Sequence, residues 1–169
     1  MSRNRLRKPV AETPSVPNAD ARRAARATYL KELRVSELRL GIVGLHNHYH
    51  AYPFADQIGK GIDGVRLVAV ADERRELAKS FGERYCDGDW TTDYAQLIQR
   101  DDIDAVIVTS YTSAHADHVE LAARAGKHVL LDKPIATNLA DAKRIVEAGK
   151  SVKIMLAYLL RYLPAYRQA

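Results

Sequence analysis

The chain carries five short runs of apolar residues, which begin near residue 38 and recur up to residue 157. The runs are Leu40–Gly44, Val65–Ala71, Asp104–Thr109, His128–Leu131 and Lys153–Ala157. Runs of this length that are rich in Val, Ile and Leu are typical of strands buried on both faces of a sheet. The pattern predicts five parallel strands.

The segments between these runs have polar residues and apolar residues at helical spacing, such as Leu77 and Phe81. They predict helices over Ala51–Lys60, Glu73–Tyr85, Tyr94–Gln99, Ala114–Ala125 and from a cap at Thr137 or Asn138 to Gly149. Strands that alternate with helices indicate an α/β fold with a doubly wound parallel sheet and right-handed crossovers.

The residues before the first run differ in composition. Residues 1–39 hold 10 basic and 4 acidic side chains, whereas residues 40–169 hold 16 and 17. Three prolines follow the first basic cluster, and a helix is predicted from Asn18 or Asp20 to Arg34. We expect a flexible basic extension over residues 1–36. Nucleic-acid binding would rest on this segment alone, and it is disfavoured because no aromatic residues interleave with the basic run.

Composition narrows the class of protein. Hydrophobic residues make up 47% and charged residues 28%, as in ordinary globular proteins. Cys86 is the only cysteine, which excludes an intramolecular disulfide and a cysteine-rich zinc cluster. The longest uncharged stretch, Ala105–Ala116, is too short to cross a bilayer. We therefore expect a soluble, cytoplasmic protein with no membrane partner.

In a doubly wound sheet, ligands bind beyond the carboxyl ends of the strands. Gly44 ends the first run, and Asp72 follows the second run 28 residues later. An acidic residue at this place can accept hydrogen bonds from a ribose diol of a dinucleotide. The alternative is that Asp72 only caps the helix predicted to start at Glu73.

The turn after Gly44 departs from the G-x-G-x-x-G fingerprint, because His46 and Tyr49 occupy the second and third glycine positions. The side chain of His46 must either swing aside or contact the diphosphate itself. The start of the following helix still offers backbone N–H groups to a phosphate. These residues leave dinucleotide binding open, with His46 and Asn47 as candidate contacts.

His46, His48 and His50 alternate in the same turn. Three neutral imidazoles could meet one zinc ion if this turn were extended. A thiol is not nearby and Asp56 is the nearest carboxylate, so a polar loop without a metal is favoured over a metal site.

Asp132, Lys133 and Pro134 follow the fourth run directly. Proline fixes the turn, which would direct Lys133 into the crevice at the strand ends. A lysine there can bind a hydroxyl or carboxylate group, or exchange a proton. Without further context, an ordinary surface lysine is the favoured interpretation.

Two longer stretches resemble the Gfo/Idh/MocA oxidoreductases, the relatives of glucose–fructose oxidoreductase and inositol 2-dehydrogenase. The first is Asp101–Thr109, with His115 after it, and the second is Ala125–Ala136. In the second stretch a Gly-Lys-His-Val motif is followed by Asp-Lys-Pro, where the family has Glu-Lys-Pro. The segment Ala157–Ala165 resembles the exit from the family's nucleotide domain. The resemblance extends from about Leu38 to Tyr166.

This resemblance implies a Rossmann-like NAD(P)-binding domain with a set of cofactor-binding residues and one catalytic residue. Lys133 would contact the nicotinamide ribose and the substrate and assist proton transfer. The cofactor contacts would be Gly44, His46, Asn47, Asp72, Thr109, Ser110, Tyr111, His115, Asp132 and Arg161. The chain departs from the family pattern at three places. The glycines expected at positions 46 and 49 are absent, Tyr111 stands near where a proline is usual, and Asp132 replaces the family's Glu.

The resemblance also predicts the domain organisation: an extension over 1–36, a nucleotide-binding domain over 37–158, and the start of a crossover to a missing substrate domain over 159–169. The expected activity is hydride transfer between a nicotinamide cofactor and a sugar, polyol or related hydroxyl compound. This chain alone is expected not to catalyse that reaction. The alternative is a non-catalytic or degenerate dinucleotide-binding module. The expected partner is a dinucleotide. A small-molecule substrate would bind only together with the missing domain, and the full-length protein could form a homo-oligomer.

NAD is the expected cofactor, with NADP also possible. A carboxylate at Asp72 accepts hydrogen bonds from a free 2′-hydroxyl and repels a 2′-phosphate. Arg74 and Arg75 follow and could instead bind that phosphate. On a helix that starts at Glu73 they would point about 100° apart, so at most one of them would face the site.

Overall fold

The structure is a computed structural model of the 169-residue chain. It describes residue 24 and residues 37–164. The predicted basic extension and its helix therefore lie outside the described residues, apart from Ala24. Within the described ranges, no helix is long and apolar enough to cross a membrane.

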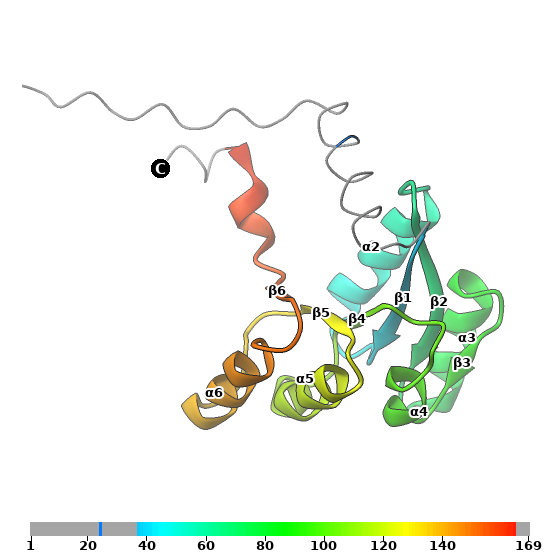
Figure 1. Ribbon diagram of the computed structural model, residues 1–169. Helices are drawn as coiled ribbons and strands as arrows, with labels where there is room; N and C mark the ends of the chain where they lie inside the picture. The colour runs from blue at the N-terminus through cyan, green and yellow to red at the C-terminus, as the bar shows by residue number, and fades with distance from the viewer. Residues whose placement is uncertain (1–23, 25–36, 165–169) are drawn as a thin grey trace, which may run out of the picture.

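Six parallel strands form one sheet (Figure 1). The strands are β1 (Leu38–Val43), β2 (Val65–Ala71), β3 (Trp90–Thr91), β4 (Ala105–Val108), β5 (His128–Leu131) and β6 (Ile154–Leu156). Their order is β3-β2-β1-β4-β5-β6, so the chain winds outward from β1 and then returns to the other side of it at β4. This order confirms the predicted doubly wound α/β fold and places a topological switch point between β1 and β4.

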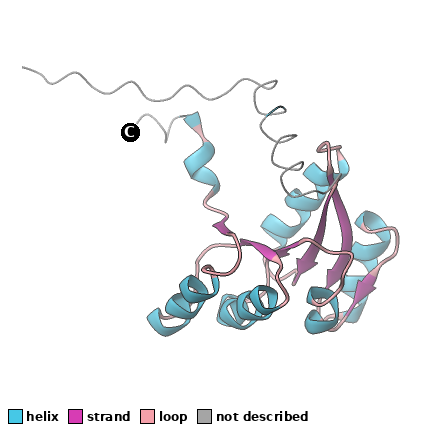
Figure 2. Cartoon of the chain, in the orientation of Figure 1, coloured by secondary structure: helices cyan, strands magenta, loops and turns pink. Residues whose placement is uncertain are grey.

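The helices lie on both faces of this sheet (Figure 2). They are α2 (His48–Gly59), α3 (Arg75–Tyr85), α4 (Tyr94–Ile98), α5 (His115–Arg124) and α6 (Leu139–Ala148), with 3₁₀ turns η1 (Thr112–Ala114) and η2 (Leu159–Tyr162). Neighbouring strand residues point to opposite faces, so Ile42 joins a core cluster with Phe81 of α3, and Val43 joins another with Val119 of α5. Two apolar cores thus hold the strand ends rigidly in place.

The main differences from the prediction are the starts of two helices and one additional strand. Helix α2 begins at His48 instead of Ala51, because the carbonyl of Asn47 accepts hydrogen bonds from the N–H groups of His50 and Ala51. Helix α3 begins at Arg75 and not at Glu73. Strand β3 was not predicted, because two residues are too short to produce an apolar run.

The cap of α6 agrees with the prediction. The side chain of Asn138 accepts a hydrogen bond of 2.9 Å from the N–H of Asp141, as an N-cap residue does.

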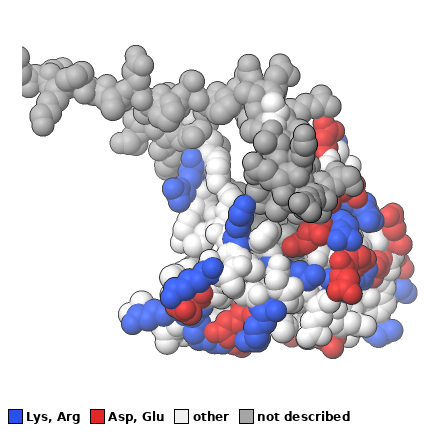
Figure 3. Space-filling model, viewed as in Figure 1, with Lys and Arg blue, Asp and Glu red and all other residues white. Residues whose placement is uncertain are grey.

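Basic and acidic side chains are interspersed on the face of the described residues that Figure 3 presents. This distribution agrees with the nearly balanced charges of residues 40–169 in the sequence.

Candidate functional site

The carboxyl ends of β1, β2, β4 and β5 bring the candidate residues to one edge of the sheet. Hydrogen bonds tie these ends together: the N–H of Gly44 donates to Ala71, and the N–H of Asp132 donates to Val108. Thr109 donates its N–H to Val43 and its hydroxyl to the carbonyl of Gly44. Gly44, Thr109 and Asp132 therefore have fixed positions relative to one another.

Gly44 is required by both its conformation and its surroundings. Its φ of 82° lies in the left-handed region, which side chains disfavour. A Cβ at this position would lie 2.5 Å from the Cα of Ser110. The turn after β1 thus passes directly against the loop after β4, as the first glycine of a dinucleotide-binding turn does.

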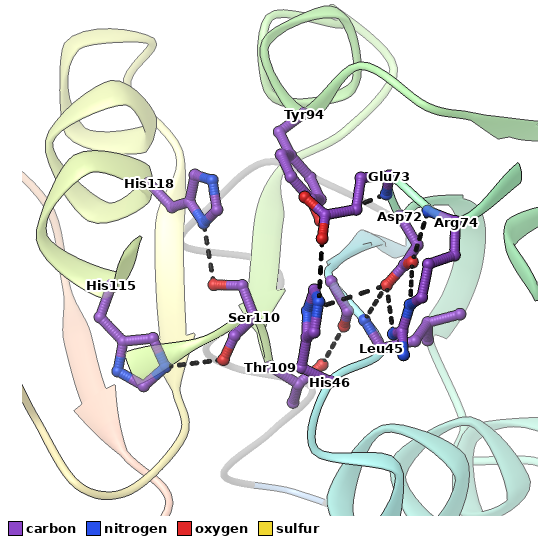
Figure 4. Close-up of polar contacts among 11 residues, drawn as sticks. Leu45, His46, Asp72, Glu73, Arg74, Tyr94, Thr109, Ser110, His115 and His118 are labelled. Atoms are coloured by element: carbon purple, nitrogen blue, oxygen red, sulfur yellow. Dashed lines mark hydrogen bonds and ion pairs between the residues drawn. The ribbon is translucent and has the colours of Figure 1, made fainter. Parts of the chain in front are cut away.

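Asp72 lies at the end of β2 and is fully buried. Its carboxylate accepts the N–H of Leu45 at 2.6 Å, the N–H of Arg74 at 2.9 Å, and two guanidinium bonds from Arg74 at 2.8 and 2.9 Å (Figure 4). Burial raises the pKa of Asp72, but these hydrogen bonds outweigh burial and hold the pKa below its ordinary value. Asp72 is therefore a carboxylate that fastens the turn after β1 to the end of β2.

The two arginines after Asp72 have different surroundings. Arg74 precedes α3 and folds back onto Asp72, whereas Arg75 stacks over the ring of Trp90, with its guanidinium carbon 4.9 Å from the ring centroid. The expected helical geometry for both arginines was wrong, because the helix starts one residue after Arg74. The alternative role of Asp72 as a helix cap is also wrong, since the N-cap residue of α3 is Arg74.

A surface cavity of about 470 Å³ adjoins Arg74, between α2 and α3, and it is lined by Leu45, His48, Tyr52, Arg74 and Leu77. A larger groove of about 740 Å³ lies between α5 and α6. The larger groove is lined by none of the residues that follow the strands. The cavity at Arg74 adjoins the strand-end site, because Leu45 and Arg74 line it.

His46 is buried, and its ring stacks against Tyr111 with 3.4 Å between the ring centroids. Its Nε2 lies 3.4 Å from a Glu73 carboxylate oxygen and its Nδ1 lies 4.0 Å from an Asp72 oxygen. Neither nitrogen has a hydrogen-bond partner among the described residues. The ring points toward Asp72, Glu73 and Tyr94 (Figure 4).

Asp132 is also buried, and its carboxylate forms hydrogen bonds within the chain. It accepts hydrogen bonds from the side-chain amide of Asn47, from Nδ1 of His50 and from the N–H of Lys133. These bonds join the first turn of α2 to the loop after β5. Sequence reasoning missed His50 as a partner of Asp132, because the two residues are 82 positions apart.

The loop after β4 is held by two histidines. His115 is 1% exposed, with Nδ1 3.1 Å from the carbonyl oxygen of Pro134 and Nε2 3.2 Å from that of Ser110. Nδ1 of His118 shares a 2.9 Å hydrogen bond with the hydroxyl of Ser110. Burial lowers the pKa of His118. His118 was not predicted as a site residue, although its spacing on the predicted helix placed it one turn from His115.

Arg161 lies apart from this group. It belongs to η2, which extends away from the sheet beyond β6 (Figure 1), and it is exposed. The hydrogen bonds and ion pairs of the described residues do not join its side chain to the other predicted site residues.

The three histidines of the first turn also separate. His46 points to Asp72 and Tyr111, His50 points to Asp132, and His48 stacks on Tyr49. The extended turn that would bring three imidazoles to one ion is the start of α2, where side chains diverge around the helix.

A glycine turn after β1, a buried carboxylate after β2 and a switch point between β1 and β4 define a doubly wound domain of the dinucleotide-binding type. Residues 38–159 match the family model described as "Oxidoreductase family, NAD-binding Rossmann fold", the Gfo/Idh/MocA family. The chain belongs to this family and contains its NAD(P)-binding domain.

Several relatives of the chain are named as sugar or inositol enzymes. It is 36% identical over 104 residues to dTDP-3,4-didehydro-2,6-dideoxy-alpha-D-glucose 3-reductase of Actinomadura kijaniata, covering 60% of this chain and 31% of that protein. It is 33% identical over 119 residues to myo-inositol 2-dehydrogenase of Thermotoga maritima, covering 70% of this chain and 35% of that protein. The chain thus spans about a third of the length of these relatives.

Solved structures agree with this assignment. A 3-ketoreductase from Actinomadura kijaniata in complex with NADP matches with a TM-score of 0.69 and 31% identity, covering 78% of this chain and 42% of that one. The apo scyllo-inositol dehydrogenase from Lactobacillus casei matches with a TM-score of 0.69 and 26% identity, covering 79% and 40%.

Proposed function

We propose that this chain supplies the cofactor half of an oxidoreductase that transfers hydride between a nicotinamide and a hydroxyl-bearing carbon of a sugar, polyol or related compound. The observation that carries the proposal is the buried Asp72 carboxylate, which is hydrogen-bonded to the turn after Gly44 at the switch point of the sheet. The relatives named above act on deoxysugars and inositols, which supports this substrate class.

The residues present fit a dinucleotide at this edge. The glycine turn brings backbone close to the loop after β4, and the first turn of α2 has N–H groups without intrahelical partners, as every helix N-terminus does. A diphosphate would lie against that first turn. NAD(P), when bound, supplies the carbon that accepts or donates the hydride.

We assign the residue roles as follows. Asp72 and Arg74 face the adenosine ribose, and Tyr111 lies at the same end through its contact with His46. Ser110 faces the middle of the cofactor, and the buried Thr109 holds the turn at Gly44. Lys133 binds the nicotinamide ribose and the substrate hydroxyl and carries the proton that accompanies hydride transfer.

Two further predicted cofactor contacts receive a positioning role in this proposal. Asp132 has both carboxylate oxygens bonded within the chain, and His115 has both ring nitrogens against backbone carbonyls. We propose that Asp132 holds the Lys133 loop against α2, and that His115 joins the loops after β4 and β5. Arg161 keeps its proposed role only if η2 approaches the cofactor.

Cofactor choice depends on the Asp72–Arg74 pair. A free carboxylate at the 2′ position repels the phosphate of NADP, but the Arg74 guanidinium compensates the charge of Asp72 and is itself half exposed. We therefore propose a modest preference for NAD, with NADP also bound.

The alternative is a non-catalytic or degenerate dinucleotide-binding module, and the buried side chain at position 46 is the observation that favours it. The cytoplasmic location and the homo-oligomer stay predictions.

The test is calorimetric titration of the chain with NADH and with NADPH, on the parent and on Asp72→Ala. We expect saturable binding of both cofactors by the parent, with NADH bound several-fold more tightly, and a loss of about tenfold in NADH affinity in the variant, equivalent to about 1.4 kcal/mol. Absence of binding by the folded parent would establish the degenerate module instead. Unchanged NADH affinity in Asp72→Ala would refute the role of Asp72.

A further inference from the structure

The ring of His46 lies where the proposed function places the adenosine ribose. Its two nitrogens face carboxylate oxygens of Asp72 and Glu73, at 4.0 and 3.4 Å, and dashed lines join the ring to both residues in Figure 4. The imidazole and the Arg74 guanidinium both lie against the Asp72 carboxylate, so a ribose that approaches this carboxylate meets one of these two side chains. The obstruction therefore affects the adenosine end of the site.

Tyr111 covers this imidazole from the solvent side. The two ring centroids are 3.4 Å apart with 40° between the ring planes. The His46 side chain is 6% exposed, whereas Tyr111 is 55% exposed. His46 is thus the inner member of the pair and Tyr111 the outer member, which can move away without leaving a buried pocket.

The closed arrangement also has an unfavourable feature. Both imidazole nitrogens are buried without a hydrogen-bond partner among the described residues. A buried polar group without a partner destabilises the arrangement that buries it, and rotation into water or toward a phosphate oxygen would satisfy it. The contact with Tyr111 and the nearby carboxylates opposes this rotation, so two opposing effects determine how strongly the closed position is favoured.

We propose that His46 and Tyr111 form an affinity-determining gate over the adenosine end of the dinucleotide site. The pair closes this end in the free protein, and a dinucleotide binds only when the pair has opened. This inference rests on the proposed function. It makes His46 neither a metal ligand nor a permanent block, but a side chain that lowers the fraction of protein competent to bind.

The expected effect follows from that fraction, because the apparent dissociation constant equals the intrinsic constant divided by it. A closed arrangement favoured about ten to one weakens apparent binding about tenfold. The weakening should apply to ligands that carry adenosine, such as NADH and ADP-ribose. Nicotinamide mononucleotide, which lacks adenosine, should be unaffected.

The experiment compares the parent with His46→Gly, Tyr111→Ala and the double variant, and it uses Tyr162→Ala as a control. Tyr162 is a tyrosine of similar exposure, 59%, in η2. Calorimetric titration with ADP-ribose, NADH and nicotinamide mononucleotide is expected to give about tenfold tighter binding of the first two in His46→Gly. Tyr111→Ala should gain less, the double variant no more than His46→Gly, and the control nothing.

Unfolding of the parent, the two single variants at positions 46 and 111 and the double variant in urea gives a second readout that needs no ligand. Since the rings are in contact, the effects of His46→Gly and Tyr111→Ala on the free energy of unfolding should not be additive in this double-mutant cycle. The unfolding transitions also establish that each variant is folded.

The outcomes separate the gate from the function on which it rests. If the parent binds NADH but His46→Gly binds ADP-ribose with unchanged or weaker affinity, the gate is refuted and the proposed function stays intact. Additive stability effects would equally refute it. Failure of every folded variant to bind NADH would overturn the proposed function, and the gate with it.

Discussion

Asp72 illustrates at the residue scale how one side chain joins structure to function. The spacing of 28 residues from Gly44 predicted where it lies, but its partner Arg74 could not be predicted. That contact depends on α3 starting after Arg74, so that the backbone at Arg74 is extended and the guanidinium can turn back. The same pairing moderates the charge on which the choice between NAD and NADP depends.

The Asp72 hydrogen bonds predict a pH-dependent contribution to stability. Asp72→Asn should lower the free energy of unfolding by about 2 kcal/mol at pH 7, because the charge-assisted bonds to Arg74 are weakened. The folded-state pKa lies below the ordinary value of 3.8, so the stabilisation is complete above that value and is lost as the pH falls through the folded-state pKa.

The measurement is chemical unfolding of parent and Asp72→Asn between about pH 7 and pH 3. The difference between the two proteins should stay constant down to about pH 5 and shrink below about pH 4. Asp87→Asn is the control, since Asp87 is exposed in a turn and should show a small difference throughout. A difference for Asp72→Asn that persists unchanged at the lowest pH would contradict the assignment of the lowered pKa.

At the element scale, the sequence predicted every strand that has an apolar run and every α-helix, with errors at their ends. Strand β3 was missed because only Trp90 and Thr91 pair with β2. The start of α2 was placed late because its first residues are histidines and a tyrosine, which give no helical pattern. Contacts between elements, such as His50 with Asp132, depend on packing that no local pattern encodes.

The turn after β1 gives a prediction at this scale. Gly44→Ala should lower the free energy of unfolding by more than about 3 kcal/mol, since it combines strain at positive φ with a clash against the backbone of Ser110. Gly61→Ala is the matched control: φ is 89° there, but no atom lies within 4 Å of the added Cβ. The control should cost about 1–2 kcal/mol.

Thermal and urea unfolding of both variants check this comparison. Equal losses of stability in Gly44→Ala and Gly61→Ala would mean that the close approach of the loop after β4 does not exist in solution.

At the scale of the whole molecule, two core clusters on opposite faces of one sheet hold the strand ends that form the site. Among the described residues, all members of both clusters come from residue 40 onward. The match to the family model starts at residue 38 and so includes both clusters.

We accordingly expect the segment before Ser36 to be dispensable for folding, because its sequence has little apolar surface to bury. A chain that starts at Ser36 should unfold cooperatively, with a midpoint within about 2 °C of the parent, as measured by circular dichroism on heating. Loss of the cooperative transition would show that the N-terminal segment packs on the sheet and its helices.

The central claim is that a dinucleotide binds along the carboxyl ends of β1, β2, β4 and β5, and the most direct measurement is NMR titration of the isotope-labelled chain with NADH. The account predicts saturable shifts of the amide signals of Gly44, Asp72, Ser110 and Lys133, with Gly126 and Gly149 in distant turns as internal controls. Shifts confined to the groove between α5 and α6, or no saturable shifts at NADH concentrations in the millimolar range, would contradict it.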